Sequence, residues 1–122
     1  MQFLFAAKLL ITHLPQGDAY RLTLEYLLRN GVGRANACSQ PDIVDYLKSQ
    51  GVDMSVTKFQ QTILKRSRAE EVFIASSSQG CFLIADKVDA ITMREFYKKR
   101  IQAESRNLRQ LKKLSRSRGW AI

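Results

Sequence analysis

The chain has 122 residues, enough for one domain of ordinary size, and 45% of them are hydrophobic, so we expect a packed core. Its formal charge of +9 favours a polyanionic partner such as nucleic acid or an anionic membrane. Two cysteines and one histidine are too few for a disulfide framework or a metal site, so we expect reduced thiols, no metal and no cofactor.

The positive charge is concentrated near the C-terminus. Residues 1–90 carry 10 basic and 9 acidic side chains, whereas residues 91–122 carry 10 basic and 2 acidic ones. The net charges are therefore +1 and +8. We accordingly expect a nearly neutral domain over residues 1–89, with an N-terminal extension over 1–17, and a basic C-terminal helix with a frayed tail over 90–122.

The N-terminal segment of residues 1–11 is apolar except for Gln2 and Lys8. It lacks the basic start and small-residue cleavage site of a signal peptide, and it is too short to cross a bilayer. We expect it to form an element packed in the core or at a dimer interface.

The first long helix is expected over about Ala19–Asn30. Asp18 can cap its start, and Gly31 stands where a left-handed residue would end it. The following stretch, Val32–Cys38, is short and can hold at most a brief strand. The predicted inward face of the helix consists of Tyr20, Leu24, Leu27 and Leu28.

Two further helices are separated by a turn of about four residues. Ser39 can cap the first of them, which Gly51 ends, and Ser55 can cap the second, which runs to about Arg68. Such a pair forms a helix-turn-helix unit. The predicted inward residues are Ile43, Val44 and Leu47 of the first helix and Val56, Phe59 and Ile63 of the second.

A change to β-type sequence follows the helix-turn-helix. Val72–Ala75 and Cys81–Ile84 are short β-prone runs, and the polar stretch Ser76–Gly80 joins them, which predicts a β-hairpin. The helical period then returns from about Ala90 to Ser115. The expected fold is therefore α+β and mostly helical: a winged helix-turn-helix, with the hairpin as its wing, followed by a long basic C-terminal helix.

The hairpin also carries a resemblance to a known family. The segment Phe73-Ile74-Ala75-Ser76-Ser77-Ser78-Gln79-Gly80-Cys81-Phe82-Leu83-Ile84, followed by a basic helix that contains Arg100, resembles the winged helix-turn-helix DNA-binding proteins of bacteriophages and mobile genetic elements. The resemblance extends from about Ser39 to Leu114 and leaves residues 1–30 outside. It implies the winged-helix fold and a DNA-binding role.

The outward face of the helix that begins after Ser55 could read bases. Glutamine can pair with adenine, lysine or arginine can contact guanine, and threonine can touch a thymine methyl group or a phosphate. The alternative interpretation is an ordinary solvated polar face. The candidate base-contacting residues are Thr57, Lys58, Gln61, Lys65 and Arg68.

A second group of residues could contact phosphates. Hydroxyl and amide groups near the hairpin tip can donate hydrogen bonds to phosphates, and cations of the last helix can bind them without sequence preference. The alternatives are a flexible turn at the tip, and a solvated helix, a disordered tail or an amphipathic membrane helix at the C-terminus. The candidates are Ser55, Ser77, Ser78, Gln79, Lys98, Lys99, Arg100, Arg106, Arg109, Lys112 and Lys113.

An apolar stripe also runs along the basic helix, with Glu104 interrupting it. It could pack on the chain's own domain or pair with a second copy, and we favour a homodimer that would bind half-sites about one DNA turn apart. The stripe consists of Met93, Tyr97, Ile101, Leu108 and Leu111.

No catalytic motif is present in the sequence, neither a glycine-rich phosphate loop nor a nucleophile elbow, so we expect no enzyme. The favoured function is sequence-specific binding of double-stranded DNA by a cytoplasmic or nucleoid-associated transcriptional regulator of a phage or mobile element, with no membrane partner and no small-molecule cofactor. The alternatives are an accessory role in replication, recombination or packaging, and a winged helix that binds protein or RNA.

Overall fold

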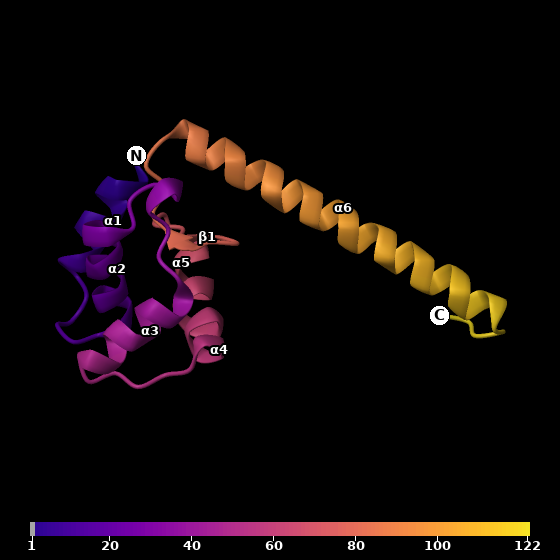
Figure 1. Ribbon diagram of the computed structural model, residues 1–122, viewed down its shortest axis with the longest axis horizontal. Helices are drawn as coiled ribbons and strands as arrows, with labels where there is room; N and C mark the ends of the chain where they lie inside the picture. Colours follow the sequence, from indigo (N-terminus) through magenta and orange to yellow (C-terminus); the bar gives the residue numbers. More distant parts are fainter. Residues whose placement is uncertain (1) are drawn as a thin grey trace. The chain divides into compact units, whose positions relative to one another are not determined.

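A computed structural model describes residues 2–122, and the chain forms two compact units, Met1–Asp89 and Ala90–Ile122 (Figure 1). The fold is α+β, mostly helical, with one small antiparallel sheet of two strands. In chain order the elements are α1 (Phe3–Ile11), α2 (Ala19–Asn30), the 3-10 helix η1 (Arg34–Asn36), α3 (Gln40–Ser49), α4 (Val56–Phe59), the π-helix η2 (Gln60–Leu64), α5 (Lys65–Arg68), β1 (Ala75–Ser77), β2 (Gly80–Phe82) and α6 (Lys87–Ser117).

The N-terminal segment forms α1, which packs on the core as expected. Ala6 and Ala7 are buried, and Ala7 has no exposed surface. The small side chains on this face let α1 approach α2 closely. Two large apolar side chains of the same helix are exposed, because Phe5 keeps 56% and Leu9 keeps 45% of its surface in solvent.

Helices α2 and α3 begin at the predicted caps. The Asp18 carboxylate accepts the backbone N–H groups of Tyr20 at 2.9 Å and Arg21 at 3.2 Å. The Ser39 hydroxyl accepts the N–H of Asp42 at 3.1 Å. These bonds satisfy amide groups that have no partner within the first turn of a helix. The predicted range of α2 is confirmed.

Gly31 ends α2 for a different reason from the one predicted. Its φ of −128° is not left-handed, so handedness does not require glycine there. A Cβ atom at this position would lie 2.7 Å from Leu27 Cδ2 and 3.1 Å from Cys38 Sγ. A larger residue at this position would therefore require the Leu27 side chain to shift.

The hairpin forms, but its paired residues lie nearer to the turn than the sequence predicts. β1 and β2 pair antiparallel with Ser76 opposite Cys81 and Ser77 opposite Gly80, so only Ser78 and Gln79 form the turn. The predicted strand at residues 72–75 is wrong over most of its length. Phe73 has a left-handed φ of 42°, which interrupts the extended backbone before Ala75.

The stretch of residues 32–38 adds two single-residue bridges beside β2. Val32 pairs with Leu83 in parallel, and Cys38 pairs with Cys81 in the antiparallel sense. Cys38 N–H donates to the Cys81 carbonyl at 2.8 Å, and Cys81 N–H donates to the Cys38 carbonyl at 2.7 Å. The expected brief strand is therefore reduced to these two contacts, with η1 between them.

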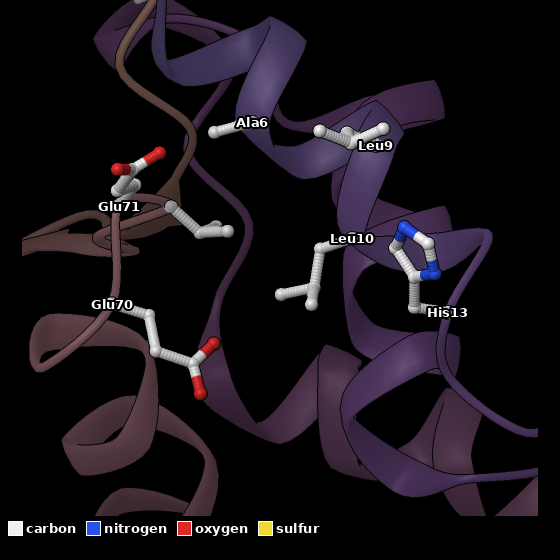
Figure 2. Close-up of a pocket in the computed structure, with 7 residues that line it drawn as sticks. Ala6, Leu9, Leu10, His13, Glu70 and Glu71 are labelled. Carbon is white, nitrogen blue, oxygen red and sulfur yellow. The ribbon is translucent and has the colours of Figure 1, made fainter.

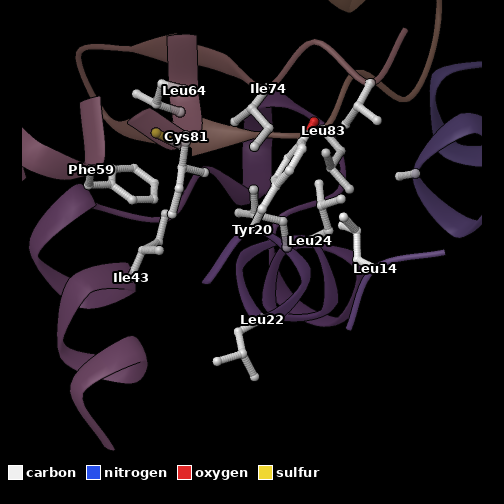
Figure 3. Close-up of a cluster of buried hydrophobic side chains, with 14 of the residues drawn as sticks. Leu14, Tyr20, Leu22, Leu24, Ile43, Phe59, Leu64, Ile74, Cys81 and Leu83 are labelled. Carbon is white, nitrogen blue, oxygen red and sulfur yellow. The ribbon is translucent and has the colours of Figure 1, made fainter. Parts of the chain in front are cut away.

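The core of the first unit lies between α2, α3, the helical run after Ser55 and the hairpin (Figure 3). Leu24, Ile43, Phe59, Ile74 and Leu83 have no exposed surface. They come from separate parts of the chain and lie within one cluster. Burial of apolar side chains is the main stabilising contribution to such a fold.

Both cysteines are free thiols, as expected from the sequence. Cys81 is fully buried, and this burial raises its pKa to about 11. Cys38 is half-buried, and its pKa is also raised, first by burial and then by the charge of Asp42. Neutral thiols are poor nucleophiles, which fits a packing role for both residues.

Helix α6 is longer at both ends than predicted. It begins at Lys87, where the Asp86 carboxylate accepts the N–H of Asp89 at 2.9 Å. It ends at Ser117, and Gly119 follows with a left-handed φ of 80°. Trp120 N–H donates to the Ser115 carbonyl at 3.0 Å, as in the C-terminal capping motif in which a left-handed glycine follows the helix. Two residues of the predicted tail, Arg116 and Ser117, are therefore helical.

Candidate nucleic-acid interface

The third helical run spans Val56–Arg68 and is continuous through α4, η2 and α5; we call it the α4–α5 helix. It begins where predicted, because the Ser55 hydroxyl accepts the N–H of Lys58 at 3.0 Å. Phe59 and Ile63 are buried in the core as predicted. Leu64, which was not among the predicted inward residues, is buried as well.

A wider turn interrupts this helix at Gln60–Leu64. Lys65 N–H donates to the carbonyl of Gln60, five residues earlier, where an α-helix would use the residue four positions earlier. The Thr62 hydroxyl donates to the Lys58 carbonyl at 2.6 Å and so competes for an acceptor of the regular ladder. The extra width brings both Ile63 and Leu64 to the buried side. Single π-turns occur frequently at functional sites.

The predicted base-contacting residues all lie exposed on the α4–α5 helix. Thr57, Lys58, Gln61 and Lys65 are exposed, whereas Phe59, Ile63 and Leu64 are buried. No acidic residue occurs between Ser55 and Ala69, so this face carries only polar and cationic groups. A face of this kind can approach phosphates without charge repulsion.

Arg68 differs from the other four predicted residues because it has structural contacts. Its Nε donates to the Ile74 carbonyl at 3.3 Å, and its guanidinium lies 5.9 Å from the centre of the Phe73 ring. These contacts hold the end of the helix against the segment that leads into β1. Arg68 therefore has less freedom than Lys65 to reach a ligand.

The neighbouring arginine, Arg66, is also engaged within the fold. Its guanidinium lies 4.6 Å from the centre of the Tyr20 ring, and its Nε forms an ion pair with Glu70 at 3.1 Å. The Tyr20 hydroxyl donates to the other Glu70 oxygen at 3.1 Å. Burial, followed by this carboxylate, raises the pKa of Tyr20. The contacts among Tyr20, Arg66 and Glu70 therefore hold the α4–α5 helix against α2.

A buried serine fixes the start of the hairpin against the end of the α4–α5 helix. The Ser67 hydroxyl donates to the Leu64 carbonyl at 2.8 Å and accepts the N–H of Ile74 at 3.1 Å. The Ser67 carbonyl also accepts the N–H of Phe73 at 3.0 Å. The direction of the chain entering β1 is therefore set by hydrogen bonds from this one residue.

The predicted phosphate-contacting residues of the hairpin divide into two kinds. Ser78 and Gln79 are exposed at the tip. The half-buried Ser77 hydroxyl accepts the N–H of Gln79 at 3.2 Å and donates to the Gly80 carbonyl at 3.4 Å, so it stabilises the turn. Ser55 is exposed, and its hydroxyl serves as the cap of the α4–α5 helix.

A glutamine that the sequence analysis missed connects the three parts of this surface. Gln40 lies at the start of α3, and its side-chain oxygen Oε1 accepts a hydrogen bond from the Gln60 side-chain amide at 2.6 Å. Its own amide nitrogen lies 3.4 Å from the Ser76 hydroxyl of β1. Gln60 and Ser76 lie 20 and 36 positions after Gln40 along the chain, so no local sequence pattern could have predicted these contacts. Gln40 positions the α4–α5 helix relative to the hairpin.

The predicted phosphate-contacting residues of the C-terminal segment lie on α6 in the second unit. All of them, from Lys98 to Lys113, are exposed. Among the described residues, the ion pairs of α6 involve only Glu95, which contacts Arg94 and Lys98. The cations after Lys98 therefore have no carboxylate partner within the described part of the chain.

The predicted apolar stripe of α6 is buried only at its N-terminal end. Met93 is buried and Tyr97 is half-buried. Ile101, Leu108 and Leu111 keep 65%, 52% and 57% of their surfaces exposed.

Comparison with known proteins does not identify a family. Neither a family model, nor a curated protein, nor a solved structure matches this chain significantly. Within residues 2–122, no helix is long and apolar enough to span a bilayer. Nor do those residues contain a cluster of three or more histidine, cysteine or acidic side chains that could hold a metal ion.

One cavity opens between α1 and the segment after α5 (Figure 2). Its volume is about 210 Å³, smaller than the roughly 300–1,000 Å³ of typical ligand pockets. Glu70 faces it but already bonds Tyr20 and Arg66. The lining residues are Ala6, Leu9, Leu10, His13, Glu70, Glu71 and Val72. This cavity is therefore a weaker candidate for the functional site than the exposed face of the α4–α5 helix.

Proposed function

We propose that this protein binds double-stranded DNA through a winged helix-turn-helix, with α3 and the α4–α5 helix as the helix pair and β1–β2 as the wing. The observation that carries this proposal is the exposed face of the α4–α5 helix. It is polar and cationic, free of acidic residues and linked to the hairpin through Gln40. A helix of this kind can enter the major groove, which admits one α-helix.

The geometry favours different roles within this face. Gln61 and Lys65 lie four residues apart on the exposed side, so they are the strongest candidates for base contacts. Lys58 lies near the capped start of the helix, where it can reach bases or phosphates. Arg68 acts mainly through its contacts with Ile74 and Phe73, which orient the hairpin. Ser78 and Gln79, which are exposed at the tip, would contact phosphates.

The basic helix α6 would add affinity that does not depend on sequence. Its cations can neutralise phosphates and release counterions, which gives binding a steep dependence on salt concentration. We therefore expect two contributions: discrimination from the α4–α5 helix and general attraction from α6. The corresponding cellular role is that of a transcriptional regulator, in a phage or mobile element as the sequence resemblance implies.

The decisive experiment compares two charge reversals in the same unit. Lys65→Glu should weaken binding to a duplex selected from a random pool by about tenfold or more, as expected for loss of one specific contact worth roughly 1–3 kcal/mol. Lys8→Glu changes the same charge on an exposed position of α1 and should have a much smaller effect. Fluorescence anisotropy at two salt concentrations measures both. Equal losses in the two variants would exclude the α4–α5 helix as the reading element.

The accessory role in replication, recombination or packaging is favoured by one observation, the concentration of a net charge of +8 in residues 91–122. In that case α6 would supply nearly all of the affinity. The selected duplex and a random duplex would then bind equally at every salt concentration. A preference of at least about a hundredfold for the selected duplex at physiological salt supports the regulatory role instead, because specific binders typically show 10³–10⁷.

A further inference from the structure

Helix α6 has an apolar stripe whose spacing alternates regularly between four and three residues. Tyr97, Ile101, Glu104, Leu108 and Leu111 follow this alternation, and the helix continues without interruption around them (Figure 1). A repeat of seven residues with two inward positions is the pattern by which two helices wind around each other. Four of the five positions are apolar, and the leucines are more than half exposed.

Three of the cations of α6 lie on the side of the helix away from this stripe. Lys99, Arg106 and Lys113 recur every seven residues. Lys99 comes two residues before Ile101 and Arg106 two before Leu108, which is a little over half a helical turn, so they lie on the opposite side of the helix. A partner seated on the stripe would therefore leave this cationic side in solvent.

We propose that α6 pairs in parallel with α6 of a second copy of this chain, along the stripe from Tyr97 to Leu111. The apolar layers of the repeat are complementary to themselves, because each places a residue against its own equivalent. The Glu104 layer instead opposes two carboxylates that repel each other. Isoleucine meets isoleucine at position 101, and leucine meets leucine at positions 108 and 111. Leu114, which keeps 42% of its surface exposed, lies beside the last of these layers and would be covered in part.

The charges beside the stripe select the parallel arrangement. In a parallel pair, each flanking residue on one side meets a residue five positions further along the partner helix. Arg100 then meets Ser105, and Asn107 meets Lys112, so no two cations are opposed. An antiparallel pairing over the same residues would instead place Lys98 opposite Lys112.

Glu104 fixes the register of the parallel pair. The two carboxylates share one layer, and a polar group within such a seam specifies alignment at a cost in stability. A register shifted by seven residues would place one Glu104 against Leu111 and the other against Tyr97 of the opposite helix. In the proposed register, Ser105 adjoins this layer and can donate a hydrogen bond to the carboxylate.

Sedimentation of the full chain without nucleic acid tests the pairing independently of DNA binding. We expect a concentration-dependent dimer, weakened at least tenfold by Leu108→Glu. The matched control is Gln110→Glu, which changes the charge equally on the exposed side away from the stripe and should leave the dimer intact. A monomer at all concentrations up to about 100 μM, or equal effects of the two variants, would overturn the proposal.

Crosslinking tests the direction. Leu111→Cys places two thiols in one layer of a parallel pair, so oxidation should yield a covalent dimer. In the antiparallel pairing these thiols would be ten residues, or about 15 Å, apart along the axis. The native thiols are buried or half-buried, and the unmodified chain is the control. A dimer that sediments as such but does not crosslink would refute the parallel arrangement.

Discussion

Gly80 is the position where the structure predicts the largest effect of adding one methyl group. Its φ of 133° lies in a region that other residues rarely adopt, and an added Cβ would lie 2.8 Å from Ser39 N and still closer to the Cys38 carbonyl. Backbone atoms cannot move aside as a side chain can. Gly80→Ala must therefore separate β2 from Cys38 and break the two backbone hydrogen bonds between Cys38 and Cys81.

The expected cost follows from these losses. The left-handed backbone costs an alanine about 1 kcal/mol, and each hydrogen bond contributes about 1 kcal/mol, which gives about 3 kcal/mol in total. Gly51→Ala is the control, because Gly51 has a φ of 89° but nothing within 4 Å of an added Cβ. It should cost only about 1 kcal/mol.

Urea unfolding, followed through methyl resonances of Leu24 and Ile43 in the core of the first unit, measures both variants without interference from α6. We expect the Gly80→Ala midpoint to fall well below that of Gly51→Ala. If the two substitutions cost the same, the close approach of β2 to Cys38 would not be a real constraint, and the placement of the hairpin would have to be reconsidered.

Three other predictions concern single residues of the same unit. Ser67→Ala should lower the free energy of unfolding by about 1–3 kcal/mol, because the buried N–H of Ile74 loses its acceptor, and an unchanged urea midpoint would contradict this. The Cys81 thiol, with its pKa raised by burial to about 11, should resist iodoacetamide at pH 8 until the protein unfolds; labelling of the native state at the unfolded rate would show that it is accessible. Gln40→Ala should weaken duplex binding several-fold without changing its salt dependence, since no charge is removed, and a changed slope in anisotropy titrations would argue against a positioning role.

Local signals were sufficient to predict most of the helices. Asp18, Ser39 and Ser55 each cap a helix as expected, because a side-chain oxygen next to an unsatisfied amide acts within three residues. The inward positions Leu24, Ile43 and Phe59 followed from helical spacing and are buried. The predicted base-contacting residues are exposed for the same reason, since they occupy the opposite side of a helix whose core side was identifiable.

The hairpin and the polar network could not be predicted in this way. The extended run was expected from Val72, but the left-handed Phe73 delays the strand until Ala75, and its sequence gives no indication of that backbone. The Gln40 contacts depend on segments that come together only in the folded unit. A strict helical period likewise does not anticipate the wider turn at η2, where both Ile63 and Leu64 are buried.

The uneven distribution of charge has a consequence for kinetics. The unit that contains the α4–α5 helix carries a net charge close to zero, whereas residues 91–122 carry +8. Long-range attraction accelerates diffusional encounter and is screened by salt, while short-range contacts govern how long a complex persists. Shortening the chain before α6 should therefore slow the capture of a duplex far more than it alters the ratio of residence times on two competing sequences.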